Sequence, residues 1–200
     1  PVPSAIFFLA LTIFHWGQGD RYLSIKLHRA QYLVRFKSLS WLHIFARGSL
    51  PILLPGFLGN ETYRLFLEAM IRQGGGSEHS LEWITQNQIL FLMVPLLLIG
   101  FQVIGSLLKH TQEERLAFCT ELLESAFLFI WFLWIPPLWA LGTYFALWHS
   151  LRHGLRILWI DQAGRKDLLS GHFLRIKGRW LQLTSLMTVL ALLGLWLILS

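Results

Sequence analysis

Long apolar segments alternate with short charged segments along the whole chain. Four stretches contain no charged residue: 1–19, 83–108, 125–151 and 180–200. About 20 apolar residues in a helix cross the ~30 Å hydrocarbon core of a bilayer. The pattern predicts six membrane-spanning helices, near 1–14, 38–59, 87–108, 117–135, 138–160 and 180–199. The predicted fold is therefore all-α: a polytopic transmembrane helix bundle that forms a single membrane-embedded domain over 1–200.

The apolar stretch 117–151 is too long for a single span. As one helix it would extend about 52 Å at ~1.5 Å per residue. Pro136 and Pro137 lie in its middle, and two consecutive prolines end or sharply kink a helix. We therefore expect two helices that are separated at these prolines.

Lys and Arg residues are distributed unevenly among the predicted loops. Loops 15–37, 109–116 and 161–179 carry twelve of them, whereas loops 60–86 and 135–137 carry two. Short positively charged loops remain in the cytoplasm. This asymmetry predicts a multi-pass protein of the cell membrane (inner or plasma membrane). Loops 15–37, 109–116 and 161–179 are then on the cytoplasmic side.

Composition excludes several other classes of protein. Apolar residues make up 54% of the chain and charged residues 14%, against about 25% charged residues in soluble domains. A soluble enzyme, a disordered chain and a DNA-binding domain are therefore excluded. The net charge of +6 reflects orientation in a lipid bilayer, and we expect no nucleic-acid partner.

Two histidines form the most concentrated polar feature inside a predicted span. His149 and His153 are four positions apart, so their imidazoles lie on one helix face. Two neutral imidazoles at this spacing favour a metal site; the alternative is a pair hydrogen-bonded within the bundle. His15 closes the first segment and could supply a third ligand, or could be a boundary residue beside Trp16.

Three carboxylates are candidates for accepting a hydrogen bond from a ligand histidine: Asp20, Glu121 and Glu124. Asp20 could equally cap a helix, and the two glutamates could equally pair with Arg115. Arg47 lies inside a predicted span and is expected to have a carboxylate partner. The remaining histidines are predicted to be solvated in or next to loops: His28, His43, His79, His110 and His172.

Three sequence elements resemble those of one enzyme family. Phe14–Asp20 matches the element Y/F-H-F/W-G-x-G-D, and the segment from Arg47 to Pro55 matches R-G-x-x-P…P. The segment from Pro136 to Arg156 contains P-P-L, Y-F and W-H-S-L-R-H in that order. The chain resembles, over nearly its whole length, the Brp/Blh-type (bacteriorhodopsin-related protein-like) β-carotene 15,15′-dioxygenases.

The resemblance implies a membrane enzyme in which histidines hold non-haem Fe(II). Such an enzyme cleaves the central double bond of β-carotene with O₂ into two molecules of retinal, which then serve a microbial rhodopsin. His15, His149 and His153 fall on the iron-ligand positions of the family. The family has a further ligand histidine in an upstream H-G-x-x-D-H element that this sequence does not contain, so we expect an N-terminally truncated chain.

Two alternative functions remain. A diiron-type membrane hydroxylase or desaturase needs several H-x-x-x-H and H-x-x-H-H clusters, whereas this sequence has one H-x-x-x-H and no adjacent histidines. A non-catalytic carotenoid- or retinal-binding membrane protein would use its histidines as hydrogen-bonding groups between helices. Iron content distinguishes them: one iron per chain for the dioxygenase, two for the diiron enzyme and none for the binding protein.

Overall fold

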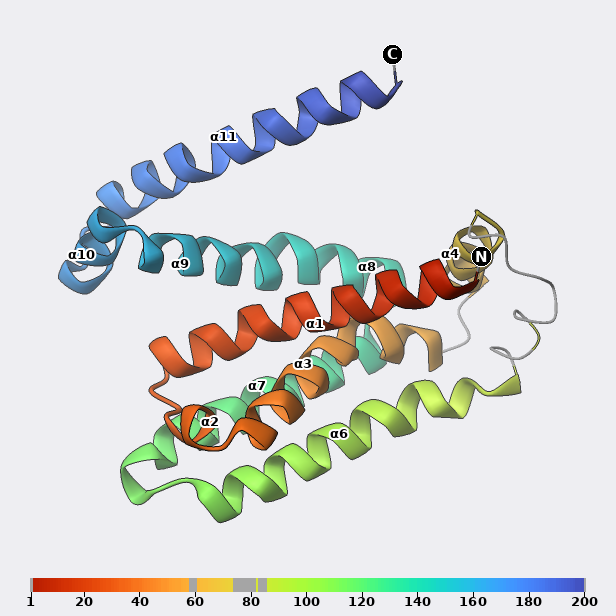
Figure 1. Cartoon of the computed structure of the whole chain (residues 1–200), viewed down its shortest axis with the longest axis horizontal. Helices are drawn as coiled ribbons and strands as arrows, with labels where there is room; N and C mark the ends of the chain where they lie inside the picture. The colour runs from red at the N-terminus through yellow and green to blue at the C-terminus, as the bar shows by residue number, and fades with distance from the viewer. Residues whose placement is uncertain (1, 58–60, 74–81, 83–85, 200) are drawn as a thin grey trace. The chain divides into compact units, whose positions relative to one another are not determined.

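The computed structural model describes residues 2–57, 61–73, 82 and 86–199, and the regular structure in these ranges is helical (Figure 1). The all-α prediction is confirmed for these residues. The chain divides into two compact units, Pro1–Trp148 and His149–Ser200, and each is described by itself. The single membrane-embedded domain stays a prediction.

The first unit is built around α3 (Lys37–Phe57). Three long helices contact it: α1 (Val2–Lys26), α6 (Gln88–Lys109) and α7 (Arg115–Trp134) (Figure 1). Because α3 touches all three, the polar residues in the middle of the helix are buried inside the unit: Ser40, His43, Arg47 and Ser49.

Shorter helices complete the first unit. α2 (Tyr32–Arg35) contacts α1 and α3, and α4 (Glu61–Gln73) contacts α3 and α8 (Pro137–Thr143). The predicted loop 60–86 therefore contains a helix over part of its length. A 3-10 turn at Gln112–Glu114 leads into α7.

The backbones of α1 and α3 touch at two glycines. A Cβ atom on Gly17 would lie 1.8 Å from the carbonyl oxygen of Ile44, and one on Gly48 would lie 1.9 Å from the carbonyl oxygen of Ile13. Only a residue without Cβ permits such an approach. At Gly19, by contrast, a Cβ atom would meet nothing within 4 Å.

The predicted break at the two prolines is confirmed. α7 ends at Trp134 and α8 begins at Pro137. Proline is suited to the first position of a helix, because a backbone N–H there would form no hydrogen bond within the helix. A π-helical turn, Tyr144–His149, follows α8 and leads into α9 (Ser150–Ile160).

The second unit contains α9, α10 (Gln162–Ser170) and α11 (Phe173–Leu199), which contact one another. The Asp161 side chain caps α10 by accepting a hydrogen bond from Gly164 N at 2.7 Å and also pairs with Arg179. The hydrogen bond from Arg179, and to a smaller extent the one from Gly164, lower the pKa of Asp161 to about 2. Gly171 ends α10 in the left-handed conformation, with φ of 70°.

Two of the predicted boundaries are wrong. The first helix continues to Lys26 instead of ending near residue 14, because Asp20 is buried against Arg47 and does not face solvent. The predicted loop 161–179 is largely helical, since Asp161 and Gly171 supply the caps of a short polar helix.

Two of the described helices are long and apolar enough to cross a membrane: Gln88–Lys109 and Gln112–Trp134, with mean hydropathies of 2.3 and 1.7. Both coincide with predicted spans. The other four predicted spans also contain helix, but α1 and α3 carry buried charges and 138–160 combines three helical segments. The six-span bundle therefore remains a proposal.

Candidate functional site

His149 and His153 share one helix face, as predicted. Their ring centroids lie 6.1 Å apart and their planes differ by 16°. His149 ends the π-helical turn and is half-buried, whereas His153 follows on α9 and is exposed. Two parallel imidazoles one turn apart match the geometry from which one helix can offer two nitrogen ligands.

His15 lies in the middle of α1 and its side chain is exposed. It belongs to the first unit, while the histidine pair belongs to the second. A common metal site formed by all three histidines therefore stays a prediction.

Arg47 is the centre of a buried polar network in the first unit. Its guanidinium donates to Asp20 Oδ2 at 3.0 Å, to Glu124 Oε2 at 2.6 Å and to Ser125 Oγ at 3.1 Å. The side chain is 1% exposed. The predicted carboxylate partner of Arg47 is thus confirmed, with one partner from α1 and one from α7.

The opposite end of the network contains two histidines. His28 Nδ1 lies 2.8 Å from Glu121 Oε1, and its Nε2 lies 3.7 Å from Glu124 Oε1. His43 Nε2 lies 3.6 Å from Glu121 Oε2. The prediction that His28 and His43 are solvated is wrong: His43 is fully buried and His28 is paired.

A helical spacing rule could have found this network from the sequence. His43 and Arg47 are four residues apart on α3, and Glu121 and Ser125 are four apart on α7, so each pair lies on one face. Two helices with such polar faces inside apolar segments are expected to pair with each other. His110 instead stacks on Phe118 at 4.8 Å, and His79 lies outside the described residues.

Within the described residues, His28, Glu121 and Glu124 also form a group whose ligand atoms lie within 4.8 Å of one another, close enough to share a metal ion. Each ring nitrogen of His28, however, faces a different carboxylate. Nδ1 lies at hydrogen-bond distance from Glu121, whereas the 3.7 Å between Nε2 and Glu124 Oε1 is too long for a hydrogen bond. Both carboxylates also pair within the buried network, Glu121 with His43 and Glu124 with Arg47, so we assign His28 to this network.

The three carboxylates proposed to support ligand histidines thus have identified partners. Asp20 and Glu124 bind Arg47, and Glu121 binds His28. The alternative partner, Arg115, does not occur in these ion pairs. A role for the three in orienting His15, His149 or His153 stays a prediction.

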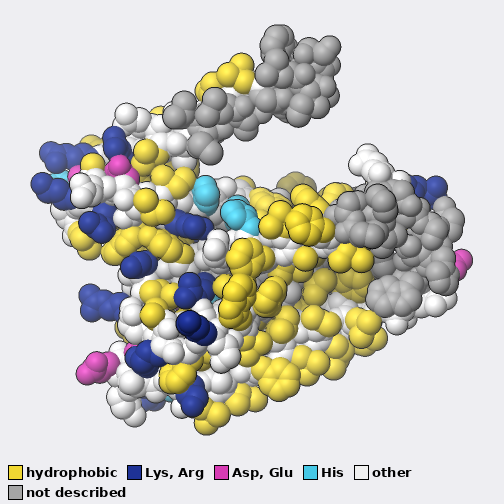
Figure 2. All heavy atoms as spheres, in the orientation of Figure 1, with side chains coloured by type: hydrophobic (Ala, Val, Ile, Leu, Met, Phe, Trp, Pro, Cys, Tyr) yellow, Lys and Arg dark blue, Asp and Glu magenta, His cyan; other side chains and the backbone are white. Residues whose placement is uncertain are grey.

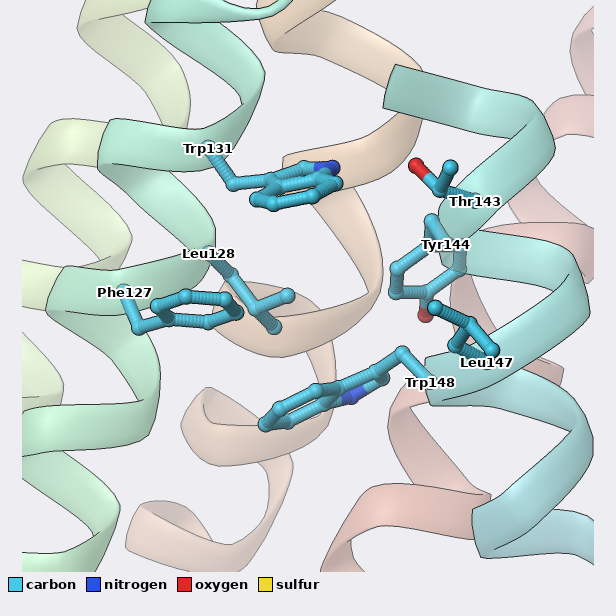
Figure 3. Close-up of a pocket in the computed structure, with 7 residues that line it drawn as sticks. All are labelled: Phe127, Leu128, Trp131, Thr143, Tyr144, Leu147 and Trp148. Atoms are coloured by element: carbon cyan, nitrogen blue, oxygen red, sulfur yellow. The ribbon is translucent and has the colours of Figure 1, made fainter. Parts of the chain in front are cut away.

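An apolar pocket of about 230 Å³ adjoins this network. In Figure 3 the ring of Trp131 lies above the pocket and that of Trp148 below it, with Phe127 and Leu128 between them on the α7 side. Tyr144, Leu147 and Thr143, from α8 and the π-helical turn, complete the lining: the pocket is thus shared between α7 and the segment after the prolines.

Arg47 connects the pocket with the three sequence elements. The guanidinium carbon lies 5.7 Å from the ring centroid of Trp148, a cation–π distance. Asp20 ends the first element, Arg47 begins the second, and Trp148 belongs to the third. Asp20 precedes Arg47 by 27 positions and Trp148 follows it by 101, yet both contact this one buried cation.

Comparison with known proteins identifies the family. The profile of the family described as beta-carotene 15,15'-dioxygenase matches residues 1–200. The chain belongs to the β-carotene 15,15′-dioxygenase family. The family resemblance seen in the three sequence elements is confirmed.

A relative within the β-carotene 15,15′-dioxygenase family is the Halobacterium salinarum protein named "Probable beta-carotene 15,15'-dioxygenase Blh". It is 32% identical over 175 residues, which are 87% of this chain and 50% of the relative. The chain thus spans about half the length of this curated relative. No solved structure matches the chain.

Proposed function

We propose that this chain is part of a membrane-embedded, iron-dependent dioxygenase that cleaves β-carotene with O₂ at its central double bond into two molecules of retinal. The match of the β-carotene 15,15′-dioxygenase family across the whole chain carries this proposal. The geometry of the histidine pair and the apolar pocket support it independently.

The proposed iron ligands are His15, His149 and His153. Neutral imidazoles suit Fe(II), and a site with fewer than six protein ligands leaves positions for other molecules. The parallel rings of His149 and His153 fit this role, because both present nitrogens from one helix face. When bound, Fe(II) supplies the activation of O₂.

The apolar pocket is the proposed binding site for part of the carotenoid. An apolar cavity of about 150 Å³ is enough to hold benzene, so a pocket of about 230 Å³ has room for a methyl-substituted six-membered ring. The Trp131 indole N–H already donates to Ala140 O, at 3.3 Å, and the Thr143 hydroxyl donates to Trp139 O, at 2.6 Å. The pocket therefore offers mainly aromatic and aliphatic surface to a ligand.

The membrane is the proposed environment and the source of the substrate. α6 has a mean hydropathy of 2.3, yet only 17% of its most apolar window is buried inside the structure. A core helix of a soluble protein would be largely covered, so the outward apolar surface suits lipid contact. We extend this to a multi-pass protein of the cell membrane whose retinal product serves a microbial rhodopsin.

The experiment is expression of the full-length protein in bacteria that make β-carotene, followed by chromatography of extracted pigments and measurement of iron. We expect loss of β-carotene, accumulation of retinal and one iron per chain. Unequal apocarotenals would contradict central cleavage. Unchanged β-carotene without iron would favour a binding protein, and two irons per chain a diiron enzyme.

Matched histidine variants test the ligand assignment. His149→Ala and His153→Ala should each abolish iron binding and retinal formation, whereas His28→Ala should retain iron, because His28 lies in the ion network instead. Iron lost from His28→Ala but kept in His153→Ala would reverse the assignment. Trp131→Ala should raise KM for β-carotene with iron content unchanged, since Trp131 lines the pocket.

A further inference from the structure

A second pocket in the first unit has a different character from the carotenoid pocket. It has a volume of about 290 Å³ and is formed by the C-terminal half of α1, by α2 and by the start of α3. Its apolar wall consists of Phe14, Leu33, Val34, Trp41 and Ile44. Its polar residues are Gln18, Arg21, Lys37 and Ser40.

The cations of this pocket lack acidic partners. Arg21 Nε donates to Ser40 Oγ, and among the described residues neither Arg21 nor Lys37 forms an ion pair. The adjacent carboxylate, Asp20, instead points inward to Arg47. No carboxylate lines the pocket, so its polar end has two uncompensated positive charges.

The apolar wall continues outward from these charges. Phe14 stacks on Trp41 at 5.7 Å, Trp41 stacks on Phe45 at 6.0 Å, and the Trp41 side chain is 52% exposed. Over the first unit, Figure 2 shows Lys and Arg side chains gathered at the end nearest α2, beside a continuous apolar surface. The same end carries the basic loop predicted to be cytoplasmic.

Cations beside an exposed aromatic and apolar strip match the two parts of a phospholipid. Phosphate oxygens accept the charge-assisted hydrogen bonds that Arg and Lys donate. Trp is enriched at the level of the headgroups, where its ring contacts the upper acyl chain. A soluble anion would use the charges but leave the apolar strip uncovered, and a neutral lipid would leave the two cations uncompensated.

We propose that this pocket binds an anionic phospholipid of the inner leaflet, with its phosphate on Arg21 and Lys37 and an acyl chain along Phe14 and Trp41. The Gln18 amide, which has no hydrogen-bond partner among the described residues, is a third group facing the headgroup. This inference rests on the proposed membrane placement but not on the proposed chemistry.

Fluorescence quenching by brominated lipids tests the proposal. Full-length protein is reconstituted in phosphatidylcholine vesicles that contain either brominated phosphatidylglycerol or brominated phosphatidylcholine, and the Trp41 signal is taken as the difference between wild type and Trp41→Phe. We expect stronger quenching of Trp41 by the brominated phosphatidylglycerol. One charge-assisted hydrogen bond contributes on the order of tenfold in affinity, so Arg21→Gln/Lys37→Gln should lower the preference by about tenfold or more.

Two control variants make the result specific. Lys26→Gln/Arg29→Gln removes the same charge from exposed positions outside the pocket and should change the preference by less than about threefold, a general surface effect. Arg21→Lys/Lys37→Arg keeps both charges and should keep the preference, which also verifies folding.

Three results would overturn the proposal. Equal loss of preference in the pocket and control variants would indicate a general surface charge effect. Loss of the preference with excess inorganic phosphate would identify a free-phosphate site. Quenching of Trp41 by neither lipid would show that this face does not contact the membrane. The proposed function is tested separately, by retinal formation.

Discussion

Replacing Gly17 by alanine should separate α1 from α3. The new Cβ atom would lie 1.8 Å from Ile44 O and 2.6 Å from the carbon of that carbonyl. Favourable non-bonded contacts are about 3.5 Å, so the helices must move apart by roughly 1.7 Å. The obstacle is backbone and cannot rotate away, as a side chain could. The same interface positions Asp20 against Arg47.

The expected cost follows from two opposing effects. Overpacking of this kind typically costs ~1–3 kcal/mol, and a rigid backbone contact belongs at the upper end. Alanine is favoured over glycine inside a helix by about 1 kcal/mol. The net loss in the free energy of unfolding for Gly17→Ala is therefore about 2 kcal/mol.

Gly19 provides the control on the same helix. A Cβ atom there meets nothing within 4 Å. Gly19→Ala therefore gains only the higher helix propensity of alanine and should stabilise the protein by about 1 kcal/mol. Unfolding of both variants is measured in the same detergent, by denaturant titration monitored by circular dichroism. Equal stability of the two variants would refute the close contact between α1 and α3.

Two further predictions concern charges. Arg47→Met should destabilise the protein by about 3–5 kcal/mol in the same titration, because Asp20 and Glu124 would remain buried without a cation. Arg47→Lys keeps the charge but not the planar guanidinium, so its stability should lie between those of Arg47→Met and wild type. Asp161 has a folded-state pKa of about 2, below its ordinary 3.8, so its contribution to stability is complete above about pH 4 and is lost as the pH falls toward 2. Asp161→Asn should remove this part of the acid dependence of the thermal unfolding midpoint; an unchanged profile would contradict the pairing with Arg179.

The helical architecture could be predicted because apolar length and paired prolines are local signals. The break at Pro136 and Pro137 and the helices over 88–109 and 115–134 are visible in a short window of sequence. The end of α1 could not be predicted in this way. Asp20 resembles a loop residue until Arg47, 27 positions away, is seen to neutralise it.

The candidate site could be predicted only where its residues lie on one helix. The shared face of His149 and His153 follows from helical periodicity alone. The burial of His43 depends on Glu121, which lies on another helix 78 positions later. The contact between Arg47 and Trp148 involves a ring face, and no spacing rule in the sequence marks a cation–π pair.

The buried Arg47 network also constrains the order in which the protein is made. Asp20 and Arg47 are separated by 27 positions, so both have been synthesised long before Glu124, which follows Arg47 by 77 positions. At roughly 5–20 residues per second on the ribosome, the interval is about 4–15 s. During this time Asp20 is the one network carboxylate already available to neutralise the guanidinium. The α1–α3 pair, joined by glycine contacts and this ion pair, is therefore the natural first step of assembly, to which α7 is added later.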